Sequence, residues 1–555
     1  MANKRNALLR SVDYLKRGQR INQEWSEESV RSRDWEDVYR SRWQHDRVVR
    51  STHGVNCTGS CSWQIHVKDG IVTWETQQTD YPSLGDDVPE YEPRGCPRGA
   101  SYSWYLYSPG RVKYPYVRAE LISAWREIRT HQENPLPAWH TLVNDPVRRE
   151  AYQKARDKGG FVRADWDTIS EMIAAAMLDT TKTYGPDRVG GFSPIPAMSQ
   201  VSFAAGSRFL SLMGGTMVSF YDWYADLPPA SPQIWGEQTD VPERADWYNA
   251  SYFIIWGTNL PMTRTPDAHF MVEARYNGTK VIGVSPDYAE YVKFADLWLP
   301  CKAGTDAALA MAMTHVILKE FYVDNPTPYF LEYAKTYTDL PFLITLTQHG
   351  EEWIPARFLN ANDLGMDVPE ADWKTIVWDE DTSSPQMPNG SLGYRWDGQQ
   401  KWNLRLENPD GTRLNPQLSF VKVPDSVLSV AFPNMQAGEV EPFVRGVPSR
   451  RLTNGRGEAV WVTTVYDLMM AHMGVSRGLP EDYPVDYDDE RAYTPAWQEA
   501  ITGVDRGLAI RVAREFADNA AKTHGRSMIA LGAGTNHWYH SDLIYRSIIN
   551  WVWLF

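Results

Sequence analysis

The chain has 555 residues and a formal net charge of −14, with 43% apolar and 23% charged residues. This length exceeds one ordinary hydrophobic core, so several domains are expected. The acidic balance excludes nucleic acid as a general partner, because phosphate binding needs a basic surface. No apolar run reaches the length of a membrane span, and the amino terminus lacks the pattern of a signal peptide. We therefore expect a cytoplasmic chain that reaches a membrane only through partner subunits.

The first hundred residues divide into two parts. Residues 1–45 are polar and predict an amino-terminal extension that contacts a partner, whereas residues 46–105 are dense in Gly, Pro and Cys. Within the second part, Trp63–Gly70 and Ile71–Glu75 read as two strands joined at an Asp-Gly turn. We expect a small, turn-rich subdomain there.

From about residue 160 onward, helices and strands alternate. Helical spacing starts at Trp166, after Asp165 as N-cap, and another helix ends near residues 214–215. This alternation predicts a parallel, doubly wound α/β arrangement. The expected strands are 188–192, 252–256, 280–284 and 527–531, and the further expected helices are 266–276, 306–321, 506–524 and one from about 537.

The sequence also suggests domain boundaries. We predict a turn-rich, cysteine-containing subdomain over 46–105, an α/β domain from 106–180 with 440–555, and a second α/β domain over 181–335. Residues 336–439 are rich in Pro, Gly, Asn and Asp and predict an irregular insertion with short strands, such as 391–395.

The carboxy terminus is unusually apolar. Residues 548–555 read as a helix without cap, polar exit or stop signal. We interpret this as a truncated chain whose final helix would expose large apolar side chains and make the chain poorly soluble.

Four potential metal ligands share one Gly-rich region. They are His53, Cys57, Cys61 and Cys96, in the spacing His-x3-Cys-x3-Cys-x34-Cys. A Cys3His set can hold tetrahedral zinc, and thiolate-rich sites also hold iron–sulfur clusters. Spacing alone leaves these two about even. The fourth cysteine, Cys301, matches no ligand and is expected to be a buried, small apolar side chain.

Polar or Gly-containing loops follow three of the predicted strands, and a fourth such segment opens a helix. In doubly wound sheets, ligands bind outside the carboxyl ends of the strands. Backbone N–H groups and small side chains there suit phosphate, ribose or base. Each loop alone is a weak signal, and no Gly-x-Gly-x-x-Gly fingerprint points to NAD. The candidate cofactor-binding residues are Gly257, Asn259, Ser285, Asp287, Gly304, Thr305, Asp306 and His537.

Four segments carry a specific resemblance. The runs Arg50–Trp63, Glu92–Trp104, Gly191–Met198 and Ser219–Pro232 resemble the respiratory nitrate reductase alpha subunit family, within the dimethyl sulfoxide reductase superfamily. The resemblance implies discontinuous, doubly wound α/β molybdopterin-oxidoreductase domains with an amino-terminal iron–sulfur subdomain. The family's carboxy-terminal β-rich domain would be absent from this chain.

The resemblance also implies cofactors and their ligands. A 4Fe–4S cluster would be held by the His53, Cys57, Cys61 and Cys96 set, with Arg98 between cluster and pterin. The nucleotide loops resemble sites for molybdenum bis-molybdopterin guanine dinucleotide.

Asp226 matches the family's protein ligand to molybdenum, and Asp222 is its rival. Asn56 and Tyr224 match positions near the metal.

The implied activity is reduction of nitrate to nitrite by oxygen-atom transfer. Electrons would arrive through the cluster from an iron–sulfur beta subunit and a membrane cytochrome b gamma subunit fed by quinol, and an assembly chaperone is a further implied partner. The expected location is the cytoplasmic face of the cell membrane. Two alternatives stay open: a nitrite oxidoreductase running the reverse reaction, and a truncated, inactive fragment.

Overall fold

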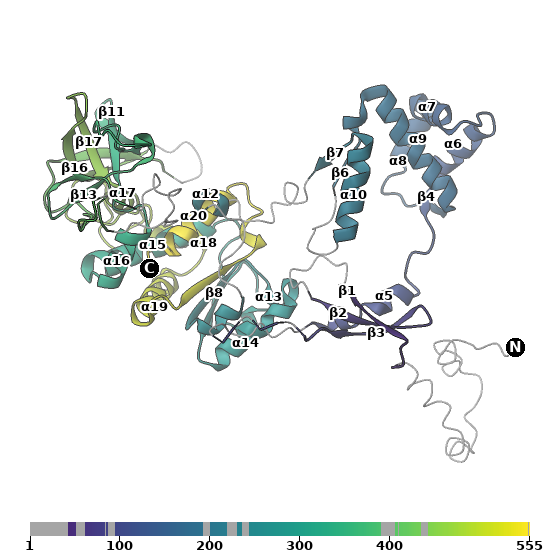
Figure 1. Ribbon diagram of the computed structural model, residues 1–555, viewed down its shortest axis with the longest axis horizontal. Helices are drawn as coiled ribbons and strands as arrows, with labels where there is room; N and C mark the ends of the chain where they lie inside the picture. Colours follow the sequence, from purple (N-terminus) through teal and green to yellow (C-terminus); the bar gives the residue numbers. More distant parts are fainter. Residues whose placement is uncertain are drawn as a thin grey trace, which may run out of the picture. The chain divides into compact units, whose positions relative to one another are not determined.

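The computed structural model describes residues 43–51, 61–80, 82–83, 85–86, 95–192, 200–218, 230–235, 244–389, 406–408, 410–434, 442–552 and 554–555. Contacts divide the chain into two units. Unit 1 comprises Met1–Tyr224 and Thr263–Asp267, and unit 2 comprises Ala225–Met262 and Ala268–Phe555. Each is described by itself, with the elements labelled in Figure 1.

Unit 1 contains a three-stranded antiparallel sheet, β1(Arg47–Ser51), β2(Trp63–Lys68) and β3(Ile71–Gln77), in that order. The expected hairpin is confirmed, because β2 and β3 pair across a turn in which Asp69 and Gly70 have φ values of 52° and 77°. Positive φ at both central positions is the geometry that favours Asp-Gly. Two short helices follow, α4(Pro97–Ala100) and α5(Ser103–Tyr107).

A helical part of unit 1 packs around its own apolar core. Ile122, Trp125, Leu142 and Met172 are buried in this core. The carboxylate of Asp165 accepts the backbone N–H of Thr168, which confirms the predicted N-cap. The elements are β4(Tyr116–Arg118), α6(Ala119–Arg129), α7(Pro135–Asn144), α8(Pro146–Lys154), β5(Phe161–Arg163) and α9(Trp166–Tyr184).

The chain then forms a small parallel strand pair. Its elements are η1(Pro186–Arg188), β6(Gly190–Phe192), α10(Gln200–Met213) and β7(Thr216–Val218). The strand expected over 188–192 is therefore shorter, because Pro186 fixes a helical φ and starts a 3-10 turn instead.

Unit 2 is built on a four-stranded parallel sheet in the order β10-β9-β8-β18. The strands are β8(Tyr252–Trp256), β9(Lys280–Val284), β10(Leu297–Leu299) and β18(Ser527–Leu531). The three strands expected over 252–256, 280–284 and 527–531 are confirmed. All five residues of β8 are buried, as a central parallel strand requires.

Helices cover this sheet and bury their apolar side chains in two main clusters. The long helices begin near the expected residues, but the last begins four residues later than expected. The elements are α12(Ser231–Trp235), η2(Arg244–Asn249), α13(Leu260–Thr263), α14(Ala268–Tyr276), η4(Val292–Phe294), α15(Asp306–Ile317), the π-helix η5(Leu318–Asp324), α16(Pro328–Tyr337), α17(Val465–His472), α18(Pro495–Thr502), α19(Arg506–Thr523), η8(Ala533–Thr535) and α20(Ser541–Val552). The short turn η3(Thr265–Asp267) belongs to unit 1.

The segment expected as an irregular insertion over 336–439 contributes three strands to a closed barrel, and the other two barrel strands come from residues 443–464. The barrel strands are β11(Leu343–His349), β12(Glu352–Phe358), β15(Ser426–Phe432), β16(Phe443–Thr453) and β17(Ala459–Thr464). They appear as the green strands of Figure 1. A smaller pair, β13(Val377–Asp379) with β14(Ser384–Gln386), and η6(Ala371–Trp373) lie in the same segment. The strand expected over 391–395 lies outside the described residues.

The apolar carboxy terminus is also different from the expectation. Ile548, Trp551, Leu554 and Phe555 are buried in the main core of unit 2, together with residues of α15 and α19. Val552 stays 39% exposed, and residue 553 lies outside the described residues. The final helix therefore finds its apolar partners within this chain, so the physical reason given for poor solubility is wrong.

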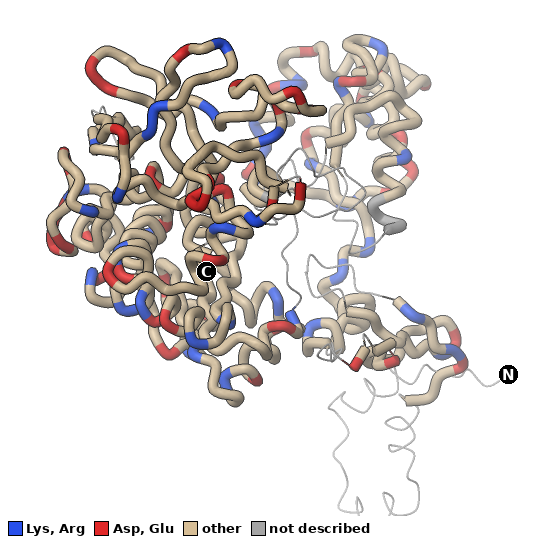
Figure 2. Tube along the Cα trace, turned by 60° about the vertical axis from the view of Figure 1, so that its left-hand side comes forward, with Lys and Arg blue, Asp and Glu red and all other residues tan. Residues whose placement is uncertain are grey.

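Along the described parts of the trace in Figure 2, Lys and Arg positions are interspersed with Asp and Glu positions. In the part of the chain that the structure describes, no helix combines the length and the apolar character needed to span a bilayer.

Candidate functional site

The loops predicted to bind a nucleotide meet at the carboxyl edge of the parallel sheet. Backbone hydrogen bonds join them: Gly257 donates to the Val284 carbonyl at 3.1 Å, and Gly532 donates to the Trp256 carbonyl at 3.1 Å. Gly534 in turn donates to the Gly257 carbonyl at 2.9 Å. The ends of β9, β8 and β18 are thus joined into one surface, at the place where doubly wound sheets bind their ligands.

Glycine is required where these loops cross. A Cβ on Gly532 would lie 2.1 Å from Thr258 Cβ, and one on Gly534 would lie 2.5 Å from the Gly257 carbonyl oxygen. Gly257 itself has a φ of +65°, which favours glycine. These glycines therefore permit close packing of one loop on the other.

Polar side chains of the loops that follow β8 and β9 hydrogen-bond to the protein itself. Ser285 is buried and its Oγ donates to the Asp287 carbonyl at 2.6 Å. The amide of Asn259 donates to the carboxylate of Glu290, and this hydrogen bond lowers the pKa of Glu290. Both side chains thus shape the loop surface.

Asp306 is an internal hydrogen-bond acceptor. It is the first residue of α15 and only 9% exposed, and its Oδ1 accepts the indole N–H of Trp256 at 2.8 Å. Burial raises the pKa of this carboxyl group. Its neighbour Thr305 donates to the Lys302 carbonyl at 2.6 Å. In this arrangement the two side chains stabilise the turn that enters α15.

Cys301 is buried beside this turn, as expected, at 1% exposure. Its Sγ lies 3.4 Å from Thr305 Oγ1, and burial raises the pKa of the thiol to about 12. A thiol that stays protonated in this way is a poor metal ligand or nucleophile.

A tryptophan that the sequence analysis passed over lies at the same edge. The Gly304 turn faces the ring of Trp538, and the Trp538 indole N–H donates to the Gly534 carbonyl at 2.8 Å. The adjacent His537 is exposed. The sequence signal that could have found Trp538 is the aromatic run that follows the β18 loop.

The segment expected to ligate molybdenum lies outside the described residues, including Asp222, Tyr224 and Asp226. Its carboxy-terminal flank is described: Ala230 is fully buried against Tyr545 and Ile549 of α20, with Leu531 of β18 alongside. Asp226 precedes Ala230 by four residues, which span at most about 14 Å.

Two of the four expected cluster ligands are described, and both belong to unit 1. Cys61 and Cys96 are buried, at 5% and 8% exposure. Cys61 lies two residues before the start of β2, and the first residue of that strand, Trp63, pairs with Gln77 at the end of β3. A Cβ on Gly95 would lie 2.3 Å from Trp63 Cη2, so the residue before Cys96 packs directly on that ring.

The two thiols therefore lie at the same end of one sheet, and this donor chemistry fits an iron–sulfur cluster or zinc. His53, Asn56 and Cys57 lie outside the described residues. Arg98 is exposed on α4.

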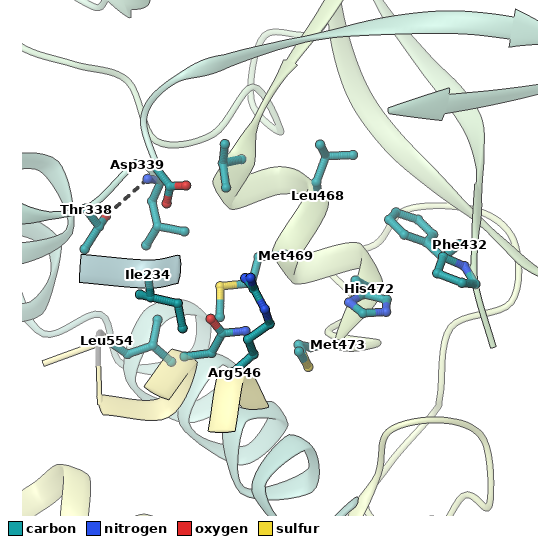
Figure 3. A pocket seen from close by; sticks show the side chains of 14 residues that line it. Ile234, Thr338, Asp339, Phe432, Leu468, Met469, His472, Met473, Arg546 and Leu554 are labelled. Carbon is teal, nitrogen blue, oxygen red and sulfur yellow. Dashed lines mark hydrogen bonds between the residues drawn. The ribbon is translucent and has the colours of Figure 1, made fainter. Parts of the chain in front are cut away.

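A separate cavity of about 450 Å³ lies between α12, α17 and α20. Figure 3 shows Arg546 beside Met469 and Ile234, with His472 on the opposite side. Burial lowers the pKa of His472 to about 4 and raises the pKa of Asp339. The walls of this cavity are mostly apolar, and its polar lining residues include Arg546, Asn550 and Thr338.

Sequence comparisons identify the family. The Molybdopterin oxidoreductase profile matches residues 111–554, which is most of the chain. The chain therefore belongs to the molybdopterin oxidoreductase family. A second profile, Respiratory nitrate reductase alpha N-terminal, matches residues 7–43.

Curated relatives narrow this further. The chain is 56% identical to the nitrate reductase alpha chain of Bacillus subtilis, over 99% of this chain and 45% of that one. It is 55% identical to the respiratory nitrate reductase 1 alpha chain of Escherichia coli, over 94% of this chain and 43% of that one. It is 57% identical to the nitrate reductase alpha subunit of Mycobacterium tuberculosis, over 93% and 42%. Its homologues are thus nitrate reductase alpha chains, of which it spans less than half.

Proposed function

We propose that this chain supplies the amino-terminal, cofactor-binding part of a molybdenum-dependent nitrate reductase. The observation that carries this proposal is the 56% identity to a nitrate reductase alpha chain along 99% of the chain. The molybdenum–pterin cofactor, when bound, would supply oxygen-atom transfer: nitrate with two electrons and two protons yields nitrite and water. The reverse reaction uses the same groups, and no feature of the described residues favours it.

The residues that would hold the pterin's nucleotide lie at the carboxyl edge of the unit 2 sheet. Gly257, Gly532 and Gly534 bring the loops together without side chains, so that a ligand could approach the loop backbone closely. Ser285 and Asn259 give this surface its polar character. The guanine dinucleotide form and the bis-pterin arrangement are part of the proposal.

Asp226 is proposed as the protein ligand to molybdenum. A hard carboxylate oxygen suits a high-valent metal whose other ligands are sulfur. The four-residue link to the buried Ala230 supports a position near the carboxyl end of β18. Asn56 and Tyr224 are proposed to lie beside the metal, and Asp222 is the rival ligand.

A 4Fe–4S cluster is proposed on His53, Cys57, Cys61 and Cys96. The burial of Cys61 and Cys96 at one end of the unit 1 sheet supports it. Arg98 would stabilise negative charge on the electron path. An iron–sulfur beta subunit, a membrane cytochrome b gamma subunit and an assembly chaperone are the proposed partners, with the complex at the cytoplasmic face of the membrane.

Metal analysis tests the cluster. The chain is expressed with beta and gamma subunits of a relative, purified without oxygen, and its iron and zinc are measured. Cys61→Ser and Cys96→Ser should each lose the cluster iron, whereas Cys301→Ser should keep it, because that thiol lies beside α15. One zinc and no iron in the unsubstituted chain would contradict the cluster.

Molybdenum spectroscopy tests the ligand and the activity. Asp226→Ala should change the molybdenum signal and abolish nitrate-dependent oxidation of reduced viologen, whereas Asp222→Ala should keep the signal. The opposite pattern would transfer the ligand role to Asp222. A complex that contains no molybdenum, or that contains it without reducing nitrate, would refute the proposed function.

A further inference from the structure

Trp538 is held rigidly although it lies on the surface. Its indole N–H donates to the Gly534 carbonyl at 2.8 Å, which fixes the ring relative to the β18 loop. The ring nonetheless remains 42% exposed. When a large apolar side chain is already fixed in place and exposed, less conformational entropy is lost when it binds a ligand.

The surroundings of the ring restrict how it can make that contact. A Cβ on Gly304 would lie 3.4 Å from both Cδ2 and Cε3 of Trp538 and 3.8 Å from Cε2. The Gly304 turn therefore faces the fusion of the two indole rings, and it does so without a side chain. Because the indole N–H already has an acceptor, the part of Trp538 that remains for a ligand is the apolar ring face.

The position of Trp538 indicates what that ligand is. The ring stands between the turn that enters α15 and the loop that follows β18, and both border the carboxyl edge of the parallel sheet. Nearby, Ser285, Asn259 and Asp306 already have protein partners. Recognition at this edge would then depend on backbone groups and ring faces more than on these side chains.

We propose that Trp538 is the stacking platform for a planar, fused nitrogen heterocycle of the cofactor, a purine base or a pteridine. The proposal rests on the proposed function and names a contact within that site. Both heterocycles present the same flat π face to an indole, and stacking of this kind tolerates either.

Equilibrium dialysis tests the contact with two probes, guanosine monophosphate for the base and neopterin for the pteridine. The protein is the complete 555-residue chain made in cells unable to synthesise the cofactor. Trp538→Ala should weaken binding of at least one probe about five- to 100-fold, because base–aromatic stacking is worth that much. Trp538→Phe should stay within about three-fold of the unsubstituted chain, because it keeps a ring face.

Two further variants separate stacking from other effects. Trp538→Leu fills much of the space of the indole without a π face, and it should bind as weakly as Trp538→Ala. The leucine variant keeps the test valid if the alanine variant folds poorly. Trp373, 69% exposed in η6, gives the matched control, because Trp373→Ala should bind both probes normally. The guanosine monophosphate released by acid from chains made in cofactor-producing cells should fall in the same order of variants.

Equal binding by the leucine variant and the unsubstituted chain would overturn the proposal. The proposal would also be overturned if the unsubstituted chain bound neither probe, or if Trp373→Ala lost as much binding as Trp538→Ala. A surface tryptophan that contacts only another protein would give the first of these results. Molybdenum content and nitrate reduction are measured separately, so the proposed function stands or falls on its own experiment.

Discussion

Arg445 is a buried cation whose hydrogen-bond partners are all main-chain carbonyls. The residue is 1% exposed. Its guanidinium donates to Ala471 at 2.7 Å, to His472 and Asp482 at 2.9 Å each, and to Ala492. Two of these carbonyls belong to the end of α17, where four carbonyls lack helical partners and a cation is favourable. Burial lowers the pKa of Arg445 to about 10, so it stays charged at neutral pH.

We expect Arg445→Met to destabilise this region by about 3–5 kcal/mol. The methionine keeps most of the apolar volume of the side chain, but it loses the guanidinium, whose carbon lies 4.2 Å from the Phe443 ring centre. It supplies no donor, however, and each buried carbonyl left unpaired costs about 1–3 kcal/mol. The substitution also removes a buried positive charge, which is favourable and offsets part of the cost of the unpaired carbonyls. The net cost is then similar to that of removing one partner of a buried charged contact.

Native-state hydrogen exchange of the amides in β16 and α17 measures this cost locally. A loss of 3–5 kcal/mol corresponds to exchange faster by a factor of about 10² to 10³ or more. Arg451 lies on the same strand with an exposed side chain, so Arg451→Met should change protection by less than about 0.5 kcal/mol. If Arg445→Met changed protection no more than Arg451→Met does, the carbonyl contacts would not be what stabilises the end of α17.

Two further substitutions test other parts of unit 2. The ring of His472 stacks on Phe432, and burial lowers its pKa to about 4. Between pH 6.5 and 4 the unfolded chain therefore binds a proton that the folded chain does not, and stability falls as pH falls, by about 3 kcal/mol in total. His472→Phe should flatten the unfolding free energy measured over that range, and parallel curves would refute the assignment. Gly532→Ala should cost at least about 1–3 kcal/mol in calorimetry, because its Cβ would meet Thr258 at 2.1 Å. Gly110→Ala, whose nearest neighbouring atom lies 3.6 Å away, should be nearly neutral, and equal effects would argue against the loop contact.

The sequence predicted the parallel sheet well for a physical reason. Residues 252–256, 280–284 and 527–531 are short apolar runs bounded by turn residues, which is the pattern of strands buried on both faces. The domain boundaries, by contrast, stay predictions, because no observation on the described residues tests them.

The barrel could not be read from such a pattern. β16 is the longest of its strands, yet it includes Arg445, Gly446, Pro448 and Arg450. Arg445 is tolerated inside because carbonyls from residues 471–492 converge on it, and Arg450 because its guanidinium lies 4.3 Å from the Trp378 ring centre. Those partners are distant in sequence, so the local pattern of these residues did not predict a strand.

The candidate site, like the fold, was predictable from the sequence only in part. Glycine-containing loops after buried strands were enough to predict a common surface, because parallel strands end at one edge. The direction of each side chain was not predictable. Asp306 accepts a hydrogen bond from Trp256, fifty positions earlier in the chain, and nothing in the local Gly-Thr-Asp pattern distinguishes that inward role from a ligand contact.

These internal hydrogen bonds affect how the carboxyl edge of the parallel sheet would recognise a cofactor. Where Asp306, Ser285 and Asn259 already bond to the protein, binding a ligand through them would require those bonds to break, and each such exchange gains little net free energy. The exposed ring face of Trp538 carries no such cost. A site of this kind would favour a flat, extended ligand with many weak contacts over a small anion with a few strong ones. The carboxyl edge of unit 2 therefore suits a nucleotide-bearing cofactor better than it suits nitrate itself.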